Sequence, residues 1–205
     1  MTSHAAESDD DLLLRIRTGD EQAFLGLYRR RQAALYRFAL HMSGSVSLAE
    51  DITQEVFLAL LREDCGYDAQ RGTLSGYLYG IARKLILRHL ERGRFDVALE
   101  GEAEDGTPAA ELAVDDDPIV DLTHREGIEA LRRAVQGLPR RYREVVVLCD
   151  LEEVDYSDAA IALGCPIGTV RSRLHRARAL LLEKLTQERS PRRAVSPLRS
   201  VRCLS

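Results

Sequence analysis

The residues best suited to bind a ligand lie in a basic stretch, GTVRSRLHRARALL, at 168–181. A helix turns by about 100° per residue, which places the nearby apolar side chains on one side: Ile167, Val170, Leu174, Ala177, Leu181 and Leu185. The polar side chains on the other faces of this helix are Thr169, Arg171, Ser172, Arg173, His175 and Arg176. Arginine can donate two hydrogen bonds to guanine in the major groove of DNA, and serine or histidine can bond base edges. These residue types at this spacing therefore predict a DNA recognition helix.

The preceding segment, YSDAAIALG at 156–164, completes the layout of a helix-turn-helix. Its small and apolar residues predict a short helix, and the glycine at its end predicts a tight turn. We expect Arg176 to face base edges and the flanking Arg171 and Arg173 to meet phosphates. Arg178 projects near the apolar stripe, so we expect it to form a packing contact or an ion pair within the domain. A solvated basic face on a surface helix is the alternative interpretation, and the turn and the arginine placement disfavour it.

The formal net charge of −4 conceals two segments of opposite charge. Residues 96–126 contain eleven acidic side chains and one basic one, whereas residues 166–193 contain eight basic and two acidic. Such separation indicates two partners or two tasks for the chain. The sequence shows neither a secretory signal nor the roughly 18 uninterrupted apolar residues of a membrane span. We therefore expect a cytoplasmic protein without membrane insertion.

Motifs that carry catalysis or bind metals are missing from the sequence. It contains no G-x-S-x-G elbow, no glycine-rich phosphate loop and no H-E-x-x-H pair. The five histidines stand singly, and the four cysteines are far apart, with no C-x-x-C pair. We therefore expect no enzyme activity, no cofactor and no bound metal, and we interpret the cysteines as reduced thiols.

The expected fold class is all-α, with two small helical domains joined by an acidic flexible linker. The first domain is predicted over residues 1–94 and the second over residues 118–186. The linker at 95–117 is acidic and has too few large apolar residues to offset chain entropy by burial. The basic tail at 187–205 is rich in serine, proline and arginine, and we expect it to be disordered.

Apolar periodicity and capping signals predict the helices themselves. The first domain is expected to have a short helix ending at Gly19, a long one ending at the Ser43-Gly44 break, and two more at 48–62 and 73–94. Ser47 and Glu50 have the spacing of a capping box for the third helix, and Thr73 can cap the fourth. In the second domain a helix is expected to begin at Pro118 and to break at the GLP sequence, 137–139.

Several segments of the chain resemble bacterial RNA polymerase sigma factors of the extracytoplasmic-function (ECF) type. LPRRYREVVVL at 138–148 and GCPIGTVRSRLHRAR at 164–178 resemble sigma region 4, whose helix-turn-helix binds the minus-thirty-five promoter element. AEDITQEVFLALL at 49–61 resembles region 2.2, which binds the clamp helices of the largest polymerase subunit. The resemblance implies promoter-specific transcription initiation. It also implies core RNA polymerase (clamp helices and flap), promoter DNA and an anti-sigma factor as partners.

The resemblance also assigns roles to two groups of side chains. One face of the 48–62 helix holds a leucine among acidic and amide groups, which suits polymerase docking: Asp51, Gln54, Glu55 and Leu58. The helix at 73–94 and the loop before it are similar to the segment that melts and reads the minus-ten element, and their aromatic and cationic side chains are Tyr67, Arg71, Tyr77, Arg83, Lys84 and Arg88. Aromatic faces stack on unpaired bases, and cations neutralise phosphates.

Three positions depart from the family pattern. Tyr77 replaces a usual tryptophan and Lys84 a usual asparagine, so we expect a different minus-ten preference. Ala159 replaces a larger aliphatic residue, which predicts looser packing of the first helix of the helix-turn-helix. Core packing is the alternative role for Tyr77 and the expected role for Tyr79.

A stand-alone helix-turn-helix regulator is the alternative function. Such proteins usually dimerise to read two half-sites. No coiled coil or receiver domain is evident here, and residues 48–94 would have no role in such a regulator. We therefore expect the chain alone to bind promoter duplex weakly, and specific initiation to require core polymerase.

Overall fold

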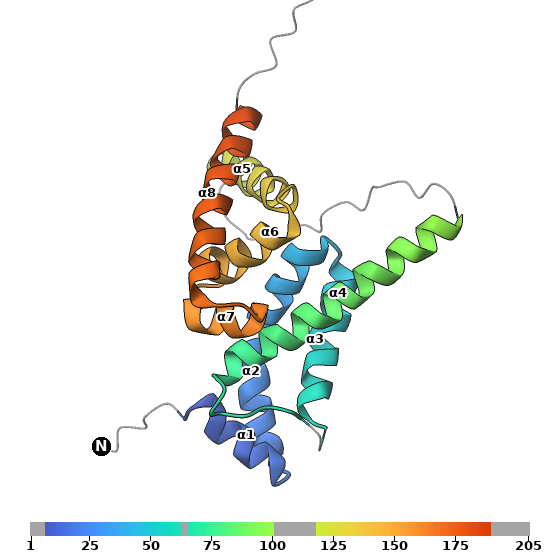
Figure 1. Cartoon of the computed structure of the whole chain (residues 1–205), viewed down its shortest axis with the longest axis vertical. Helices are drawn as coiled ribbons and strands as arrows, with labels where there is room; N and C mark the ends of the chain where they lie inside the picture. The colour runs from blue at the N-terminus through green and yellow to red at the C-terminus, as the bar shows by residue number, and fades with distance from the viewer. Residues whose placement is uncertain (1–6, 63–64, 101–117, 190–205) are drawn as a thin grey trace, which may run out of the picture.

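The computed structural model describes residues 7–62, 65–100 and 118–189, and the regular elements within them are all helices (Figure 1). These elements are α1 (Asp9–Arg17), α2 (Glu21–Ser43), α3 (Val46–Leu60), α4 (Leu74–Glu100), α5 (Pro118–Gln136), α6 (Arg140–Val146), the π-helical turn η1 (Val147–Leu151), α7 (Tyr156–Leu163) and α8 (Ile167–Arg189). The all-α prediction is confirmed. Residues 101–117 of the predicted acidic linker and 190–205 of the predicted tail lie outside the described residues.

The long helix α2 is the central element of the first unit, which comprises α1 to α4. Its first turn is capped by Asp20, whose Oδ1 accepts a hydrogen bond from the Gln22 backbone N–H at 2.9 Å. It ends at Gly44, which has φ of 74°, a conformation that costs glycine little. The buried side chains of its apolar stripe include Leu27, Leu35, Phe38 and Met42. The predicted end of this helix is therefore confirmed.

The start predicted for α3 is wrong by two residues. The helix begins at Val46, and Ser45 is its N-cap because the Ser45 hydroxyl accepts a hydrogen bond from the Leu48 N–H at 3.3 Å. Ser47, the cap that the sequence predicts, lies inside the first turn. A serine at either position can cap a helix. The chain turns at Gly44, the C-cap of α2, so the next helix begins directly afterwards and the earlier serine is its cap.

Helix α4 starts as predicted and ends later than predicted. The Thr73 hydroxyl accepts a hydrogen bond from the Gly76 N–H at 3.1 Å, which confirms Thr73 as the cap. The helix continues to Glu100, so residues 95–100 of the predicted linker are helical. The sequence between Gly93 and Gly101 contains no glycine or proline, so no helix breaker stands where the linker is predicted to begin.

The second unit comprises α5 to α8 and contains the predicted helix-turn-helix. Helix α5 begins at Pro118, and the chain breaks at 137–139 before α6, both as expected. Helices α7 and α8 are joined by a turn in which Gly164 has φ of 62°, the left-handed conformation that favours glycine. Within the described parts of the chain, no helix combines the length and apolar character needed to cross a bilayer.

The apolar stripe of α8 faces the core over the middle of its predicted length. Val170, Leu174 and Ala177 are buried, and Leu181 and Leu185 are half-buried. Ile167 is predicted to join this stripe, but 41% of its surface is exposed. It is the first residue of the helix, and its side chain lies at the wall of a cavity between the two units rather than over the core.

The two units pack against each other. Helix α7 lies on the start of α4, and α2 contacts α5, α6 and η1. The buried apolar side chains of both units belong to one continuous cluster. This packing of the two units against each other was not predicted from the sequence.

Candidate nucleic-acid interface

The polar side chains predicted to bind DNA lie on the first half of α8, away from its buried stripe. Arg171, Ser172, His175 and Arg176 are exposed, and Thr169 and Arg173 are half-buried. The Ser172 hydroxyl donates to the Thr169 carbonyl at 3.1 Å, as serine often does within a helix. The structure thus brings these side chains together on one accessible surface, as a recognition helix requires.

Two tyrosines hold arginines of this surface, and the sequence interpretation missed both. The Arg176 guanidinium donates a hydrogen bond to the Tyr142 hydroxyl and lowers the pKa of Tyr142. Arg141 lies over the Tyr142 ring at 4.7 Å, and Arg171 lies over the Tyr156 ring at 5.8 Å. Such contacts limit the rotamers of the arginines before any ligand binds. The sequence did contain a signal for the contacts of Tyr142, because this tyrosine lies between arginines in RRYR at 140–143.

Arg178 forms the ion pair that its position predicts. Its guanidinium contacts the carboxylate of Asp150, a residue of η1, at 2.6 Å, and this pairing raises the pKa of Arg178. The pair is largely exposed on the arginine side, where solvent weakens the attraction. The geometry assigns Arg178 to packing within the second unit rather than to DNA.

Replacing this arginine is expected to change stability slightly and DNA recognition very little. We predict that Arg178→Ala lowers the free energy of unfolding by less than about 1 kcal/mol, because exposed ion pairs contribute little. Urea unfolding measures the stability change, and binding to core polymerase and promoter DNA measures recognition. A loss of base specificity in this variant would contradict the assignment.

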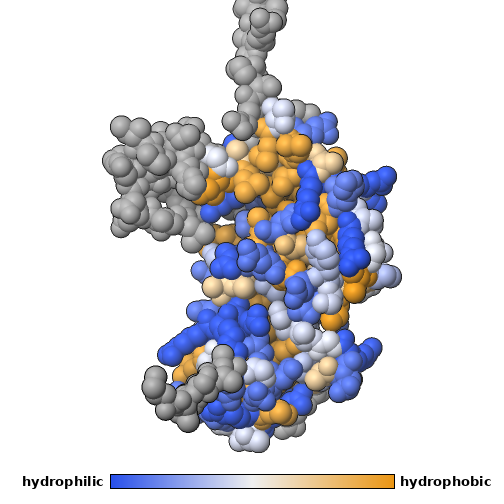
Figure 2. All heavy atoms as spheres, turned by 90° about the vertical axis from the view of Figure 1, so that its left-hand side faces the viewer, coloured by the Kyte–Doolittle hydropathy of each residue, from blue (hydrophilic) through white to orange (hydrophobic). Residues whose placement is uncertain are grey.

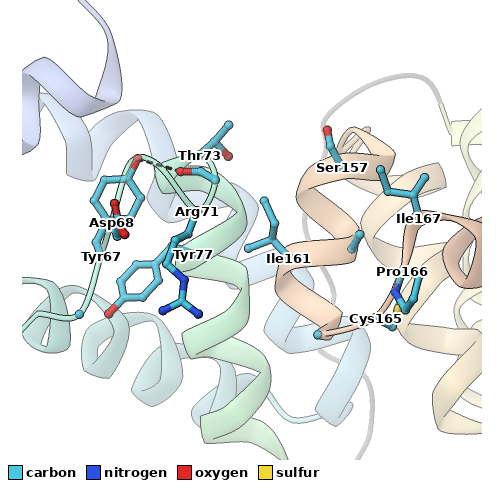
Figure 3. A pocket seen from close by; sticks show the side chains of 14 residues that line it. Tyr67, Asp68, Arg71, Thr73, Tyr77, Ser157, Ile161, Cys165, Pro166 and Ile167 are labelled. Carbon is cyan, nitrogen blue, oxygen red and sulfur yellow. Dashed lines mark hydrogen bonds between the residues drawn. The ribbon is translucent and has the colours of Figure 1, made fainter.

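The loop before α4 places Tyr67 beside Tyr77, with ring centroids 5.4 Å apart (Figure 3). The Tyr67 hydroxyl donates to the Asp10 carboxylate at 2.5 Å and lies 3.2 Å from the Gly72 carbonyl. Burial and the Asp10 carboxylate together raise the pKa of Tyr67. Arg71 is exposed on the same loop. These contacts hold the two aromatic rings together, and Arg71 lines the same cavity as both rings. Aromatic faces beside a cation are the combination expected of a base-capturing surface.

The three cations predicted along α4 are in different environments. Lys84 and Arg88 are exposed. Arg83 instead pairs with Glu144 of α6 at 3.0 Å, and only 2% of the Glu144 side chain is exposed. In this arrangement the Arg83 guanidinium is therefore paired with a carboxylate of the second unit. Tyr79 is buried as expected, and burial raises its pKa to about 12.

The face predicted to bind polymerase is accessible on α3. Asp51, Gln54 and Leu58 are exposed, and Leu58 exposes 59% of its surface. Glu55 is half-buried, and its carboxylate lies 3.5 Å from Arg88 of α4. The sequence interpretation missed Leu61, which is also exposed and lines a small groove beside α1 and α2. Two adjacent leucines at the end of the helix, Leu60 and Leu61, are a signal that the sequence did contain, because only one of them can face the core.

Within residues 7–62, 65–100 and 118–189, no group of histidine, cysteine and acidic side chains is arranged to hold a metal. Cys65, Cys149 and Cys165 are free and partly buried.

Family models match both helical units. The model for Sigma-70 region 2 matches residues 27–95, and that for Sigma-70, region 4 matches residues 128–181. The ECF RNA polymerase sigma factor SigE of Mycolicibacterium smegmatis is 36% identical over 84% of this chain and 66% of its own length. The ECF RNA polymerase sigma factor SigM of Mycobacterium tuberculosis is 34% identical over 87% of this chain and 85% of its own length.

This chain belongs to the ECF-type RNA polymerase sigma factors. Its fold is also similar to that of the sigma factor RpoE in complex with the anti-sigma factor NepR from Bartonella quintana, with a TM-score of 0.65, 24% identity, and coverage of 82% of this chain and 99% of RpoE. As a sigma factor it directs promoter-specific transcription initiation through regions 2 and 4, and it is a non-enzymatic subunit of RNA polymerase. Helices α7 and α8 form the helix-turn-helix of region 4, and α3 and α4 lie in region 2.

Proposed function

We propose that this sigma factor reads the minus-thirty-five element with Thr169, Arg171, Ser172, Arg173, His175 and Arg176 of α8. The observation that carries this proposal is the polarity of α8: its apolar stripe is buried, and a cationic face is accessible on the opposite side. Such a face enters the major groove. The units that contain regions 2 and 4 act as the two functional domains, and residues 101–117 connect the end of α4 to the start of α5.

The minus-ten element is captured by the loop before α4 and by α4 itself. Tyr67 and Tyr77 offer aromatic faces to unstacked bases, and stacking contributes about 1–3 kcal/mol per base. Arg71, Lys84 and Arg88 neutralise nearby phosphates. Arg83 joins them once its pair with Glu144 separates. The sigma factor thereby captures the opened strand without a source of chemical energy.

Core polymerase docks on two surfaces that expose apolar side chains. The clamp helices of the largest subunit bind the α3 face formed by Asp51, Gln54, Glu55 and Leu58. The polymerase flap binds the second unit where apolar side chains gather toward the upper end of the face in Figure 2. Ile128 of α5 and Leu182 of α8 are exposed on this unit, and exposed apolar patches commonly mark protein interfaces.

An anti-sigma factor is a further partner. The similar fold of RpoE, which is in complex with the anti-sigma factor NepR, supports this proposal. Such a partner competes for the surfaces that bind polymerase or DNA. Because polymerase and the chromosome are its working partners, the sigma factor acts in the cytoplasm.

Two arginine variants test the recognition surface. Arg176→Ala is expected to cost about 1–3 kcal/mol at one base pair and to relax specificity there, because it removes a base contact. Arg173→Ala is expected to weaken binding to all sequences and to reduce the salt slope by about one unit, because it removes a phosphate contact. Holoenzyme binding to promoter variants at several salt concentrations measures both effects.

The same measurement separates the alternatives. Equal behaviour of the two variants would contradict the assignment of base and phosphate contacts along α8. Tight, salt-resistant binding of the isolated chain to a palindromic site would favour a stand-alone regulator. The matched control is Glu183→Ala, which changes an exposed position of α8 outside the proposed DNA surface.

A further inference from the structure

Three consecutive aspartates, Asp9, Asp10 and Asp11, form the first turn of α1, a helix outside the proposed DNA and polymerase surfaces. Acidic side chains at the start of a helix interact favourably with the helix dipole. The dipole accounts for their charge but not for their directions, because each of the three carboxylates has a different partner. Two of these partners hold α1 in place, and the third belongs to the proposed minus-ten surface.

Asp11 stabilises the start of α1 through a capping box with Ser8. The Ser8 hydroxyl accepts a hydrogen bond from the Asp11 backbone N–H at 3.1 Å, and the Asp11 carboxylate accepts one from the Ser8 backbone N–H at 3.3 Å. The next two residues, Leu12 and Leu13, are buried against the rest of the first unit. Asp11 therefore serves α1 itself, and its side chain bonds only within the first turn.

Asp9 attaches α1 to its neighbours. Its carboxylate lies between two arginines of α2, 2.6 Å from Arg30 and 2.5 Å from Arg31. Only 11% of the Asp9 side chain is exposed, so solvent screens these pairs less than it screens pairs on the open surface. Arg31 also lies 3.5 Å from the hydroxyl of Ser75, in the first turn of α4. The first turn of α1 is therefore held against α2 and, through Arg31, against the start of α4.

Asp10 reaches from this fixed turn to the loop before α4, which passes beside α1 in Figure 1. The Tyr67 hydroxyl donates a hydrogen bond to the Asp10 carboxylate at 2.5 Å and lies 3.2 Å from the Gly72 carbonyl. Burial and the Asp10 carboxylate raise the pKa of Tyr67, so the hydroxyl keeps the proton that it donates. The hydrogen bond joins residues 57 positions apart in the sequence.

Two further hydrogen bonds of this loop are local. The Asp68 carboxylate accepts from the Gln70 backbone N–H at 2.9 Å, and the Asp68 carbonyl accepts from the Arg71 backbone N–H at 2.9 Å. Such bonds shape a turn but do not attach it to another element. The bond between Tyr67 and Asp10 does attach the loop, because it ends on a helix that is itself fixed.

The two aromatic rings proposed to capture unpaired bases differ in their support. Tyr77 is part of the regular helix α4, whereas Tyr67 belongs to the loop, and the two ring centroids are 5.4 Å apart (Figure 3). A ring that is free to move must be ordered when a base stacks on it, and this ordering reduces affinity. The hydrogen bond to Asp10 orders the Tyr67 ring before DNA is present.

We propose that Asp10 is a positioning residue for minus-ten capture, which holds the Tyr67 ring beside Tyr77 through the Tyr67 hydroxyl. This inference rests on the proposed minus-ten surface and adds α1 to the elements that determine its geometry. Asp10 acts through Tyr67 rather than by touching DNA, because a carboxylate repels phosphate.

A double-mutant cycle on the holoenzyme tests the proposal, with a labelled single-stranded minus-ten oligonucleotide as the probe. Asp10→Ala removes the acceptor, and Tyr67→Phe removes the donor but keeps the ring. Each is expected to weaken oligonucleotide binding by about three- to tenfold, the range that one hydrogen bond commonly contributes. The double variant is expected to bind no more weakly than either single variant, because both changes remove the same bond. Asp10→Asn keeps an acceptor oxygen and is expected to bind more tightly than Asp10→Ala.

The matched control is Asp11→Ala. Asp11 has the same residue type, lies in the same turn and is exposed like Asp10, but its carboxylate bonds to Ser8 rather than to the loop. This variant is expected to lower stability in urea unfolding, through loss of the capping box, and to leave oligonucleotide binding unchanged. Equal weakening of oligonucleotide binding by Asp10→Ala and Asp11→Ala would show that Asp10 only stabilises α1, and would overturn the proposal.

Tyr67→Ala separates failure of this inference from failure of the proposed function. If removal of the whole ring leaves oligonucleotide binding unchanged, the assignment of Tyr67 to the minus-ten surface is wrong, and the role of Asp10 is wrong with it. If Tyr67→Ala weakens binding but Asp10→Ala does not, only the positioning role is wrong. Effects of Asp10→Ala and Tyr67→Phe that multiply in the double variant would also overturn it, because independent changes add in free energy.

Discussion

Leu58→Asp is expected to weaken binding to core polymerase by about 2 kcal/mol or more, which is roughly a 30-fold loss of affinity. Leu58 exposes 59% of its surface on α3 between acidic and amide groups, so burial within the chain does not explain an apolar residue there. Binding of a partner that buries this side chain is favourable because it removes apolar surface from water. A carboxylate in its place would be desolvated in the same interface without a partner.

The control for this prediction is Leu14→Asp. Leu14 lies on α1 and exposes 61% of its surface, so it matches Leu58 in residue type and exposure but lies outside the proposed docking face. Affinity measured by titration of core polymerase should change for the first variant and not for the second. Equal losses for both variants, or for neither, would contradict the assignment of α3 to the clamp helices.

Phe38→Ala is expected to lower the free energy of unfolding by about 3–5 kcal/mol. The Phe38 ring is completely buried in α2 and meets the Tyr79 ring of α4 edge-on, with centroids 5.3 Å apart. Truncation removes apolar contacts and leaves a cavity that the surrounding helices fill only in part. Urea unfolding measures the loss, which would be a large share of the stability of a typical domain.

An exposed position provides the comparison for this stability change. Leu25→Ala removes a side chain of α2 that is 38% exposed, so its effect on unfolding is expected to be smaller. A loss below about 1 kcal/mol for Phe38→Ala would contradict the packing of α2 against α4. The packing matters for the proposed function because it positions the face of α4 proposed to capture the minus-ten strand relative to the face of α3 proposed to bind polymerase.

The parts of the fold predicted from the sequence are those set by local signals. The buried positions Val170, Leu174 and Ala177 follow from helical periodicity within one helix, and Thr73 caps α4 through its own first turn. The helix-turn-helix follows from the left-handed conformation that favours glycine at Gly164. Each of these features depends on residues only a few positions apart.

The parts that were missed depend on residues distant in the sequence. Arg83 pairs with Glu144, 61 residues away, and Arg37 pairs with Glu152, 115 residues away. Neither ion pair can be recognised from the periodicity of the sequence, because each arginine occupies a position in its own helix that is typical of an exposed cation. The exposure of Ile167 has the same origin: it belongs by periodicity to the stripe but lies where the two units meet.

Transcription in vitro from a random promoter library tests most directly whether one unit docks on polymerase and captures the minus-ten strand while the other unit reads an upstream element. We expect specific transcripts only when core polymerase and this chain are both present, with two separated blocks of preferred sequence upstream of each start. The absence of any sequence preference with the complete holoenzyme would contradict this division of roles between the two units.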